Sequence, residues 1–296
     1  MLSKQTKADV YEQITAALID AIEAGTGRFE MPWHTSSSPI NTANRKPYRG
    51  VNILMLWAAA RKHNYSANQW ATYRQWNELG AQVRKGEHST IVVFWKFFDS
   101  ETEEEQPLEE TDNGTRPRCF ARAYHVFNAA QVDGYETKPE NLLPESERIA
   151  QAEAFFHSLP ATIKHGGDRA FYSPSGDYIQ MPPFAQFKSA EKYVSVLCHE
   201  LSHWSGAKNR LNRDLSGRFG DASYAMEEMV AQISASFLCS DLQIRSEPSA
   251  DDAAYVSNWL SVLKQDRRAI FIAASKAQEA ANYLKQLAAV AQERAS

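Results

Sequence analysis

Two histidines and a glutamate stand close together in the run His199-Glu200-Leu201-Ser202-His203. On a helix, side chains four residues apart lie one above the other, with Cβ atoms about 5–6 Å apart. His199 and His203 can therefore direct imidazole nitrogens at one point, which suits a catalytic Zn²⁺ with an open coordination position. Such a metal lowers the pKa of its bound water, and Glu200 stands where it can take the proton as general base.

A zinc site of this kind needs a third protein ligand, and residues 223–238 offer two carboxylates on a second predicted helix. Glu227 and Glu228 are adjacent, so they point about 100° apart on that helix. Glu228 shares its face with small apolar residues such as Ala231, where a carboxylate is costly unless it is paired or bound to metal. We therefore predict Glu228 as the third ligand. For Glu227 two predictions stay open, an exposed side chain or an outer partner of a histidine N–H.

The motif requires a helix, and its flanking residues favour one between Ser189 and Gly206. Ser189 is a suitable N-cap, Glu191 lies in the first turn, where the helix dipole favours negative charge, and Gly206 is a natural residue to follow the last turn. The alternative is a buried helix that carries two histidines only for packing, which we disfavour because the motif stands in its required context. Just before this helix, residues 170–173 and 177–181 are predicted to form a hairpin.

The composition is that of a folded protein with two modest domains. The chain has 296 residues, of which 43% are hydrophobic and 11% aromatic, and this supports a packed core rather than disorder. No apolar run reaches the length of a membrane span and no signal sequence follows Met1, so we expect a cytoplasmic protein with no membrane partner. Cys119, Cys198 and Cys239 show no C-x-x-C spacing and are predicted to be small buried side chains.

Charge is distributed unevenly along the chain. Residues 30–96 carry nine Lys and Arg against three Glu, a local charge of +6, although the whole chain has a net charge of −4. A basic segment of this kind suggests an anionic partner. Within it, an irregular loop at 28–50 combines basic and aromatic residues, which favours binding over core-building, and residues 80–86 form a turn-flanked basic segment. The residues predicted to contact nucleic acid are Trp33, Arg45, Lys46, Tyr48, Arg49, Arg84 and Lys85.

The N-terminal half mixes helices and strands. Apolar periodicity predicts helices at 5–24, 52–62 and 68–79, and runs of β-branched and aromatic residues predict strands at 89–98 and 118–127. Alternation in the second strand places basic and aromatic side chains on one face. Such a face suits both base stacking and phosphate contact, and a packing ladder with charges at its edge is an equally good interpretation. The residues concerned are Arg118, Phe120, Arg122, Tyr124 and Val126.

The domain boundary is predicted where periodicity is lost. Residues 101–114 form an acidic, apolar-poor insertion that we expect to be a solvated loop, and residues 128–144 are rich in turn signals and read as a linker. We therefore predict an α+β protein with a small nucleic-acid-binding domain at 1–135 and a mostly helical domain at 145–296 that contains the metal motif.

Several stretches together resemble one family, the ArdC-type antirestriction proteins of conjugative plasmids, which are related to the N-terminal part of plasmid DNA primases. The resemblance implies an N-terminal domain that binds single-stranded DNA, a C-terminal zincin-like metallopeptidase domain, and protection of incoming DNA from host restriction. It covers nearly the whole chain. The stretches that carry it are 31–33, 47–52, 83–87, 126–131, 177–182, 199–203 and 224–231.

The metal residues also resemble those of the gluzincin class of metallopeptidases. In that class a Glu on a following helix completes a His₂Glu set, commonly with an acidic residue four positions later. Gln232 stands at that later position here, so the set of ligands matches and the outer partner departs from the pattern. In zincins a sheet edge beside the cleft pairs with an extended peptide substrate, and the hairpin at 170–181 is our candidate for that edge.

Three functional interpretations stay open at this point. The first is a plasmid-type protein that binds single-stranded DNA and holds a zinc peptidase site. The second is a regulatory zinc metallopeptidase that cleaves a specific host protein, with the basic half recognising that partner. The third is a nucleic-acid binder whose metal is structural. Zn²⁺ is favoured over Mg²⁺ because imidazole suits it, and Mn²⁺, Co²⁺ or Ni²⁺ can substitute.

Overall fold

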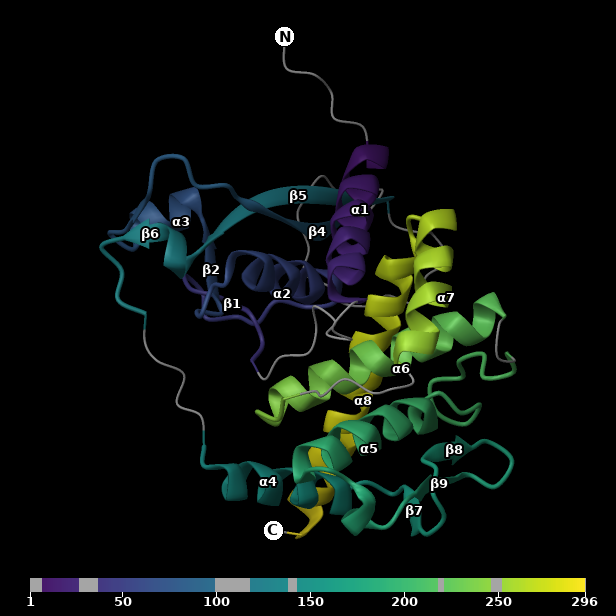
Figure 1. Cartoon of the computed structure of the whole chain (residues 1–296). Helices are drawn as coiled ribbons and strands as arrows, with labels where there is room; N and C mark the ends of the chain where they lie inside the picture. The colour runs from purple at the N-terminus through teal and green to yellow at the C-terminus, as the bar shows by residue number, and fades with distance from the viewer. Residues whose placement is uncertain are drawn as a thin grey trace.

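The computed structural model describes residues 7–26, 37–98, 118–137, 143–217, 221–245 and 252–295. Its N-terminal half combines helices with short and long strands: α1 (Lys7–Thr26), β1 (Ile40–Asn41), α2 (Val51–His63), β2 (Gln69–Thr72), α3 (Tyr73–Glu78), β3 (Gln82–Val83), β4 (Thr90–Phe98), β5 (Arg118–Asn128), η1 (Ala129–Gln131) and β6 (Val132–Asp133). Its C-terminal half is mostly helical: α4 (Glu145–His157), β7 (Thr162–His165), β8 (Phe171–Ser173), β9 (Tyr178–Met181), η2 (Phe184–Gln186), α5 (Ala190–Ser205), α6 (Ala222–Asp241), α7 (Asp252–Gln265) and α8 (Ala269–Ala295). The predicted α+β class is confirmed (Figure 1).

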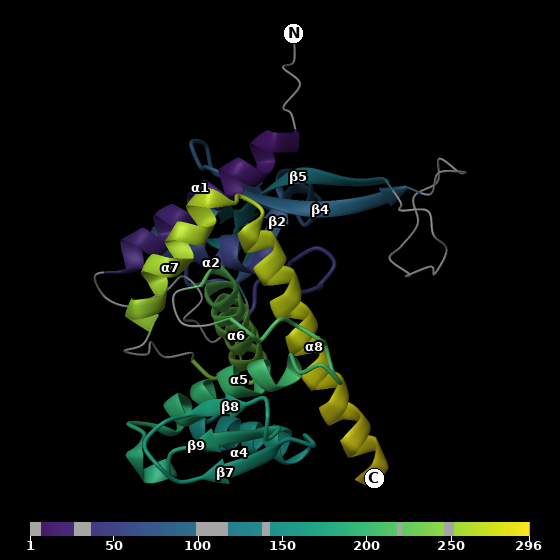
Figure 2. The ribbon, with the colours of Figure 1, turned by 90° about the vertical axis from the view of Figure 1, so that its right-hand side faces the viewer.

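The N-terminal sheet has the strand order β1-β2-β5-β4, and β4 and β5 form a long antiparallel ribbon. Asn52 at the start of α2 fastens that helix to the ribbon. Its Nδ2 donates to the Val93 carbonyl and its Oδ1 accepts from the Val93 N–H, both at 2.7 Å. The buried amide thus satisfies backbone groups at the β4 edge as a neighbouring strand would. Figure 2 shows the ribbon extending sideways from the helices. The acidic insertion at 101–114 lies outside the described residues.

The predicted helix over 68–79 is wrong in its first part, because residues 69–72 form β2. This strand pairs with β1 on one side and with β5 on the other. The helix α3 begins only after Thr72, whose side chain accepts from the Gln75 N–H while the Gln75 side chain accepts from the Thr72 N–H. Trp70 and Trp76 are both buried, but in different hydrophobic clusters. Their helical spacing therefore does not reflect one buried helix face.

The C-terminal sheet has the order β7-β9-β8, with β8 at its edge. β8 and β9 form an antiparallel pair, as the sequence predicts for residues 170–181. The helix α5 follows and packs against both strands. Its start is the predicted one, since the Ser189 Oγ accepts from the Lys192 N–H at 3.0 Å. Cys198 and Cys239 are fully buried thiols, while the side chain of Cys119 lies outside the described set.

The two halves of the chain share one hydrophobic core, which runs from α1 and α2 through α5 to α8. The rings of Trp57 on α2 and Phe237 on α6 lie 5.9 Å apart. The Gly50 N–H donates to the Gln278 side chain on α8 at 3.1 Å. In Figure 2, α8 crosses the molecule from beside α7, past α5, to the level of α4. The division into segments 1–135 and 145–296 stays a prediction, and the surfaces of these segments are buried against each other.

The first helix packs on the last helices rather than only on its own half. The Thr15 hydroxyl donates to the Arg267 carbonyl at 2.7 Å, and Lys264 pairs with Glu23 at 2.7 Å. The apolar residues Ile14, Leu18 and Ile22 on α1 are fully buried. Within the described ranges, no helix combines the length and the apolar character needed to cross a membrane.

Candidate metal centre

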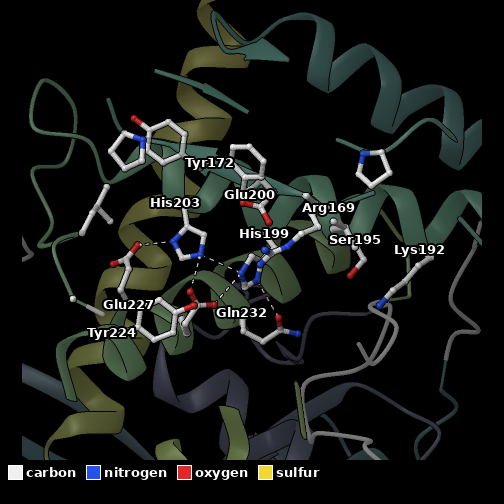
Figure 3. Close-up of a pocket in the computed structure, with 18 of the residues that line it drawn as sticks. Arg169, Tyr172, Lys192, Ser195, His199, Glu200, His203, Tyr224, Glu227 and Gln232 are labelled. Atoms are coloured by element: carbon white, nitrogen blue, oxygen red, sulfur yellow. Dashed lines mark hydrogen bonds and ion pairs between the residues drawn. The ribbon is translucent and has the colours of Figure 1, made fainter. Parts of the chain in front are cut away.

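The structure brings the three predicted ligands, His199 and His203 on α5 and Glu228 on α6, to one point. Figure 3 shows the two histidine rings turned toward each other. The Nε2 atoms of His199 and His203 lie 3.1 Å apart. The Glu228 carboxylate faces both, at 3.3 Å from His199 Nε2 and 3.5 Å from His203 Nε2. One donor atom from each of the three residues falls within 4.8 Å of the others. Two imidazoles and one carboxylate that converge in this way match the ligand types of a zinc site with an open position.

The electrostatics of this cluster favour a cation. Burial alone would raise the pKa of the Glu228 carboxyl, but hydrogen bonds from His199 and His203 outweigh burial and hold that pKa well below its usual range. Burial alone would lower the pKa of His203, but its contacts with Glu227 and Glu228 raise the pKa to about 10. The carboxylates thus stabilise positive charge at a place where water is largely excluded, so the residues present fit a divalent metal.

Each histidine is oriented by a second side chain on α6. The Nδ1 of His203 lies 3.1 Å from Glu227 Oε1, and the Nδ1 of His199 lies 3.1 Å from Gln232 Oε1. Both oxygens accept hydrogen bonds, so each ring donates through Nδ1 and turns Nε2 toward the cluster. Of the two positions predicted for Glu227, the structure shows the buried partner of a histidine. Gln232 supplies a neutral oxygen where gluzincins commonly carry a carboxylate.

Arg213 is a functional residue that the sequence reasoning missed. Its guanidinium is buried and donates to Glu227 twice, through Nε at 2.9 Å and Nη2 at 2.8 Å. It also donates to the Ser202 carbonyl at 2.6 Å and to the Ser205 hydroxyl at 3.0 Å on α5. Arg213 therefore connects the C-terminal end of α5 to the Glu227 carboxylate, which orients His203. It lies in the polar connection between the two helices, and no spacing there distinguishes it.

Gly206 serves this arrangement for a reason other than the predicted one. It ends α5 with φ −79°, so it does not use the left-handed conformation that favours glycine. A Cβ at this position would lie 2.8 Å from the Nη2 of Arg213. The glycine is therefore needed for the close approach of the guanidinium.

Glu200, the predicted base, projects into the same pocket from α5. It is 7% exposed, and burial raises the pKa of its carboxyl. The backbone of Tyr172 on the edge strand β8 forms a hydrogen bond with it. The pocket has a volume of about 560 Å³, and Arg169, which precedes β8, and Lys192 on α5 line it together with the metal cluster. A cleft of this size, with a strand edge beside it, can hold an extended peptide segment.

The predicted nucleic-acid contacts fall into different environments. Arg45, Lys46 and Arg49 are exposed on the loop between β1 and α2. Tyr48 in the same loop is only 5% exposed, and burial raises the pKa of its hydroxyl to about 12. Its ring offers no open face to a base, so the prediction of Tyr48 as a stacking residue is corrected. Trp33 lies outside the described residues.

The second predicted group lies near the β3–β6 pair. Lys85 is exposed. The Arg84 guanidinium is engaged by Glu87 at 2.9 Å and by Asp133 at 3.5 Å, and it also donates to the carbonyls of Val132 and Ala130. Arg84 therefore braces its own turn, which limits what it can offer to a phosphate. Sequence reasoning could not separate these cases, because the burial of Tyr48 and the contacts of Arg84 with Ala130, Val132 and Asp133 depend on distant segments.

Both halves of the chain match known families. Residues 8–127 match the N-terminal domain of anti-restriction factor ArdC, and residues 150–276 match a zincin-like metallopeptidase family. The fold is similar to crystal structures of the antirestriction ArdC protein from plasmid R388, one metal-free and one bound to Mn(II). Each has a TM-score of 0.76 and 38% identity, and the similarity covers 95% of this chain and 98% of theirs. The chain belongs to the ArdC family of antirestriction proteins.

Further relatives extend this ArdC family assignment. The uncharacterized protein y4eC of Sinorhizobium fredii is 51% identical over 284 residues, which cover 95% of this chain and 92% of that protein. Two DNA primases named TraC from Escherichia coli are each 36% identical over 95% of this chain. The matched region makes up only 27% and 20% of those primases. The predicted resemblance to ArdC-type proteins is confirmed.

Proposed function

We propose that this chain is an antirestriction protein that binds single-stranded DNA and carries a zinc-dependent peptidase centre. In this proposal it acts in the cytoplasm and protects plasmid DNA that enters by conjugation from host restriction. The observation that carries the enzymatic part is the convergence of His199, His203 and Glu228 within 4.8 Å beside a buried glutamate. The similarity to the R388 protein over the whole chain supports the biological part.

His199, His203 and Glu228 would hold the metal, most suitably Zn²⁺, with Mn²⁺, Co²⁺ or Ni²⁺ as substitutes. When bound, such a metal would polarise a carbonyl oxygen and lower the pKa of a bound water, so that the water can lose a proton. Glu200 takes a proton from that water at its carboxylate and passes it to the leaving amine. Burial raises the pKa of Glu200, which suits a group that must both accept and donate a proton. The β8 edge would align the peptide of a host protein substrate.

The nucleic-acid part of the proposal rests on the exposed basic residues of the N-terminal half. Arg45, Lys46 and Arg49 stand together in a loop whose residues 43–49 include no acidic side chain, and Lys85 adds a further exposed cation. Such residues bind phosphates and release counterions, so affinity should fall steeply with salt. Single strands should bind more tightly than duplexes, because duplex DNA hides the faces of its bases.

The test combines binding with protection. The full-length protein is titrated with a labelled single-stranded oligonucleotide and with its duplex at two salt concentrations. Unmethylated plasmid is then transferred into restricting and non-restricting recipients that express wild-type protein or a combined Arg45→Ala, Lys46→Ala and Arg49→Ala variant. We expect tighter binding of single strands and protection only by the wild type. Equal transfer into the restricting host with and without the wild-type protein would refute the proposal.

A regulatory peptidase that uses its basic half to recognise a protein partner predicts a different result. It would bind oligonucleotides no better than an unrelated protein of equal charge does at physiological salt. The same titration therefore separates the two functions. Substitution of Glu200 tests the third function, a nucleic-acid binder with a purely structural metal. The substitution removes the predicted base and spares the three predicted ligands, so it should leave the behaviour of such a binder unchanged.

A further inference from the structure

Two aromatic rings lie on one face of the β4–β5 ribbon. Phe94 on β4 is directly opposite Arg122 on β5, and Tyr124 follows two residues later, so all three side chains share a face. The rings of Phe94 and Tyr124 meet edge to face, with centroids 5.4 Å apart and planes at 85°. The Arg122 guanidinium lies 5.2 Å from the centre of the Tyr124 ring. Phe94 is 46% exposed, so a large apolar surface faces solvent beside a cation.

This face, which we call the Phe94 platform (Phe94, Arg122 and Tyr124), is continuous with the basic loop at 43–49. The ring of Tyr48 lies 6.4 Å from that of Phe94, between the exposed neighbours Lys46 and Arg49. The buried Tyr48 belongs to the loop and lies near Phe94, so it connects the loop to the platform. Arg122 is paired opposite Phe94 on β5, and the basic loop reaches the Phe94 ring through Tyr48.

The basic loop is held in a fixed conformation. Asn41 closes it, because its side-chain oxygen accepts from the backbone N–H of Ala43 at 3.0 Å and its Nδ2 donates to the Tyr48 hydroxyl at 3.3 Å. The backbone N–H of Asn41 also donates to the Lys46 carbonyl at 2.9 Å. A preformed loop loses little conformational entropy when it binds, which favours affinity.

A second exposed aromatic residue allows the platform to be judged by comparison. Tyr73 is 48% exposed and lines an open groove with Phe127 and Lys85. That groove also holds Glu87 and Asp133, which engage its arginine. Positive and negative groups balance there, whereas the Phe94 platform and the loop at 43–49 present only cations among their charged residues. The two sites therefore match in exposed aromatic surface and differ in charge.

We propose that the Phe94 platform is the base-stacking site for single-stranded DNA. A base lies on the Phe94 ring, Arg122 contacts a phosphate on one side, and the loop residues Arg45, Lys46 and Arg49 contact phosphates on the other. The inference rests on the proposed binding of single strands and adds where the strand lies. Stacking on an exposed ring tolerates any base, so the site selects single strands without reading sequence.

The test uses full-length variants and an oligonucleotide of mixed sequence. We expect Phe94→Ala to weaken binding by about 5- to 150-fold, the range that loss of one stacked base produces, with an unchanged salt dependence. Arg122→Ala should weaken binding and reduce the slope of log affinity against log salt by about 0.7. Tyr73→Ala is the matched control and should bind as the wild type does. Phe94→Trp should retain affinity.

A base-free strand of deoxyribose phosphate provides the second arm. It keeps the phosphates, so wild type and Phe94→Ala should bind it equally. Binding of the mixed-sequence strand by Phe94→Ala within twofold of wild type, or a larger loss with Tyr73→Ala, would overturn the assignment while single-strand binding stands. Failure of the wild type to bind any strand at low salt would instead overturn both this inference and the proposed function.

Discussion

Arg213 donates two hydrogen bonds, of 2.9 and 2.8 Å, to the Glu227 carboxylate. Glu227 in turn orients His203, whose Nδ1 lies 3.1 Å from the Glu227 Oε1. The metal cluster is therefore supported by a residue from the connection between its two helices. Because Arg213 is the cation that donates to both oxygens of Glu227, its removal would leave that buried carboxylate without its cation. This support has consequences for metal binding that can be measured apart from any enzymatic activity.

Arg213→Lys should weaken Zn²⁺ binding by about 10- to 100-fold, the usual effect of losing an outer partner of a metal ligand. Lysine keeps the charge but cannot fork onto both carboxylate oxygens. The measurement is competition with a chromogenic chelator. Arg210→Lys is the control, because Arg210 pairs with Asp177 and contacts none of the three predicted ligands. Equal losses in both variants would show that general destabilisation, and not the orientation of His203, weakens binding.

His199→Ala should abolish stoichiometric metal binding, because only one imidazole and one carboxylate of the cluster would remain. Removal of the metal with a chelator should also lower the melting temperature of the wild type, since any ligand that binds only the folded state stabilises it. Metal analysis after dialysis and thermal unfolding measure the two effects. A His199→Ala protein that retains one zinc per chain would contradict the assignment of the site.

Glu200→Gln should retain its metal and lose hydrolysis. The substitution preserves the shape of the side chain and removes the basic oxygen, and general-base catalysis typically contributes about 10²- to 10⁴-fold. The measurement pairs metal content with cleavage of a panel of unfolded proteins, and chelator-treated wild type is the negative control. Cleavage at the wild-type rate by Glu200→Gln would rule out this residue as the base.

Because the Tyr48 hydroxyl is buried, we expect the folded protein to lose stability at alkaline pH. Burial raises the pKa of its hydroxyl from 10.0 to about 12, so between these values the folded protein binds more protons than the unfolded chain does. The stabilisation is present below pH 10 and is lost as pH rises through about 12. Relative to Tyr48→Phe, the wild type should lose up to about 2.5 kcal/mol over this range. Denaturant unfolding at several pH values measures the loss, and the exposed Tyr73→Phe is the control.

Phe237→Ala should destabilise the whole molecule. Phe237 is 3% exposed on α6 and packs against Trp57 on α2, so its truncation should cost about 3–5 kcal/mol. Oligonucleotide binding and metal binding should then disappear at the same denaturant concentration. Ile272→Ala, at a 43% exposed position on α8, should change stability little. Two separate transitions in the wild type would refute a single shared core.

The chemistry of this protein could be predicted from sequence where it depends on spacing within one helix. His199 and His203 are four residues apart, and that spacing alone brings their rings together. Ser189 caps its helix through a contact three residues away, which is also local. The preference for Glu228 over Glu227 followed from the apolar face of one helix, and the structure turns Glu228 to the cluster.

The predictions that failed, and the role of Arg213 that sequence reasoning missed, depend on contacts between different elements. Tyr48 stands in an irregular loop with basic neighbours, and its burial depends on packing into the main core, where its ring lies near Phe94 of β4. Arg213 gains its role from a carboxylate fourteen residues later on another element. Residues 69–72 have helical spacing, yet pairing with β1 and β5 makes them a strand. In each case the partner that decides the outcome lies on another element, where local pattern carries no information.

The core shared by α2, α6 and α8 also bears on how such genes can recombine. A crossover between the two halves would join surfaces that did not evolve together, and the mismatch would fall on buried rings such as Trp57 and Phe237. Exchange of one half for a foreign one should therefore yield chains that misfold, whereas transfer of the entire unit leaves every buried contact intact. The TraC primases contain a region that aligns with 95% of this chain, so a region similar to both halves together occurs there within a longer protein.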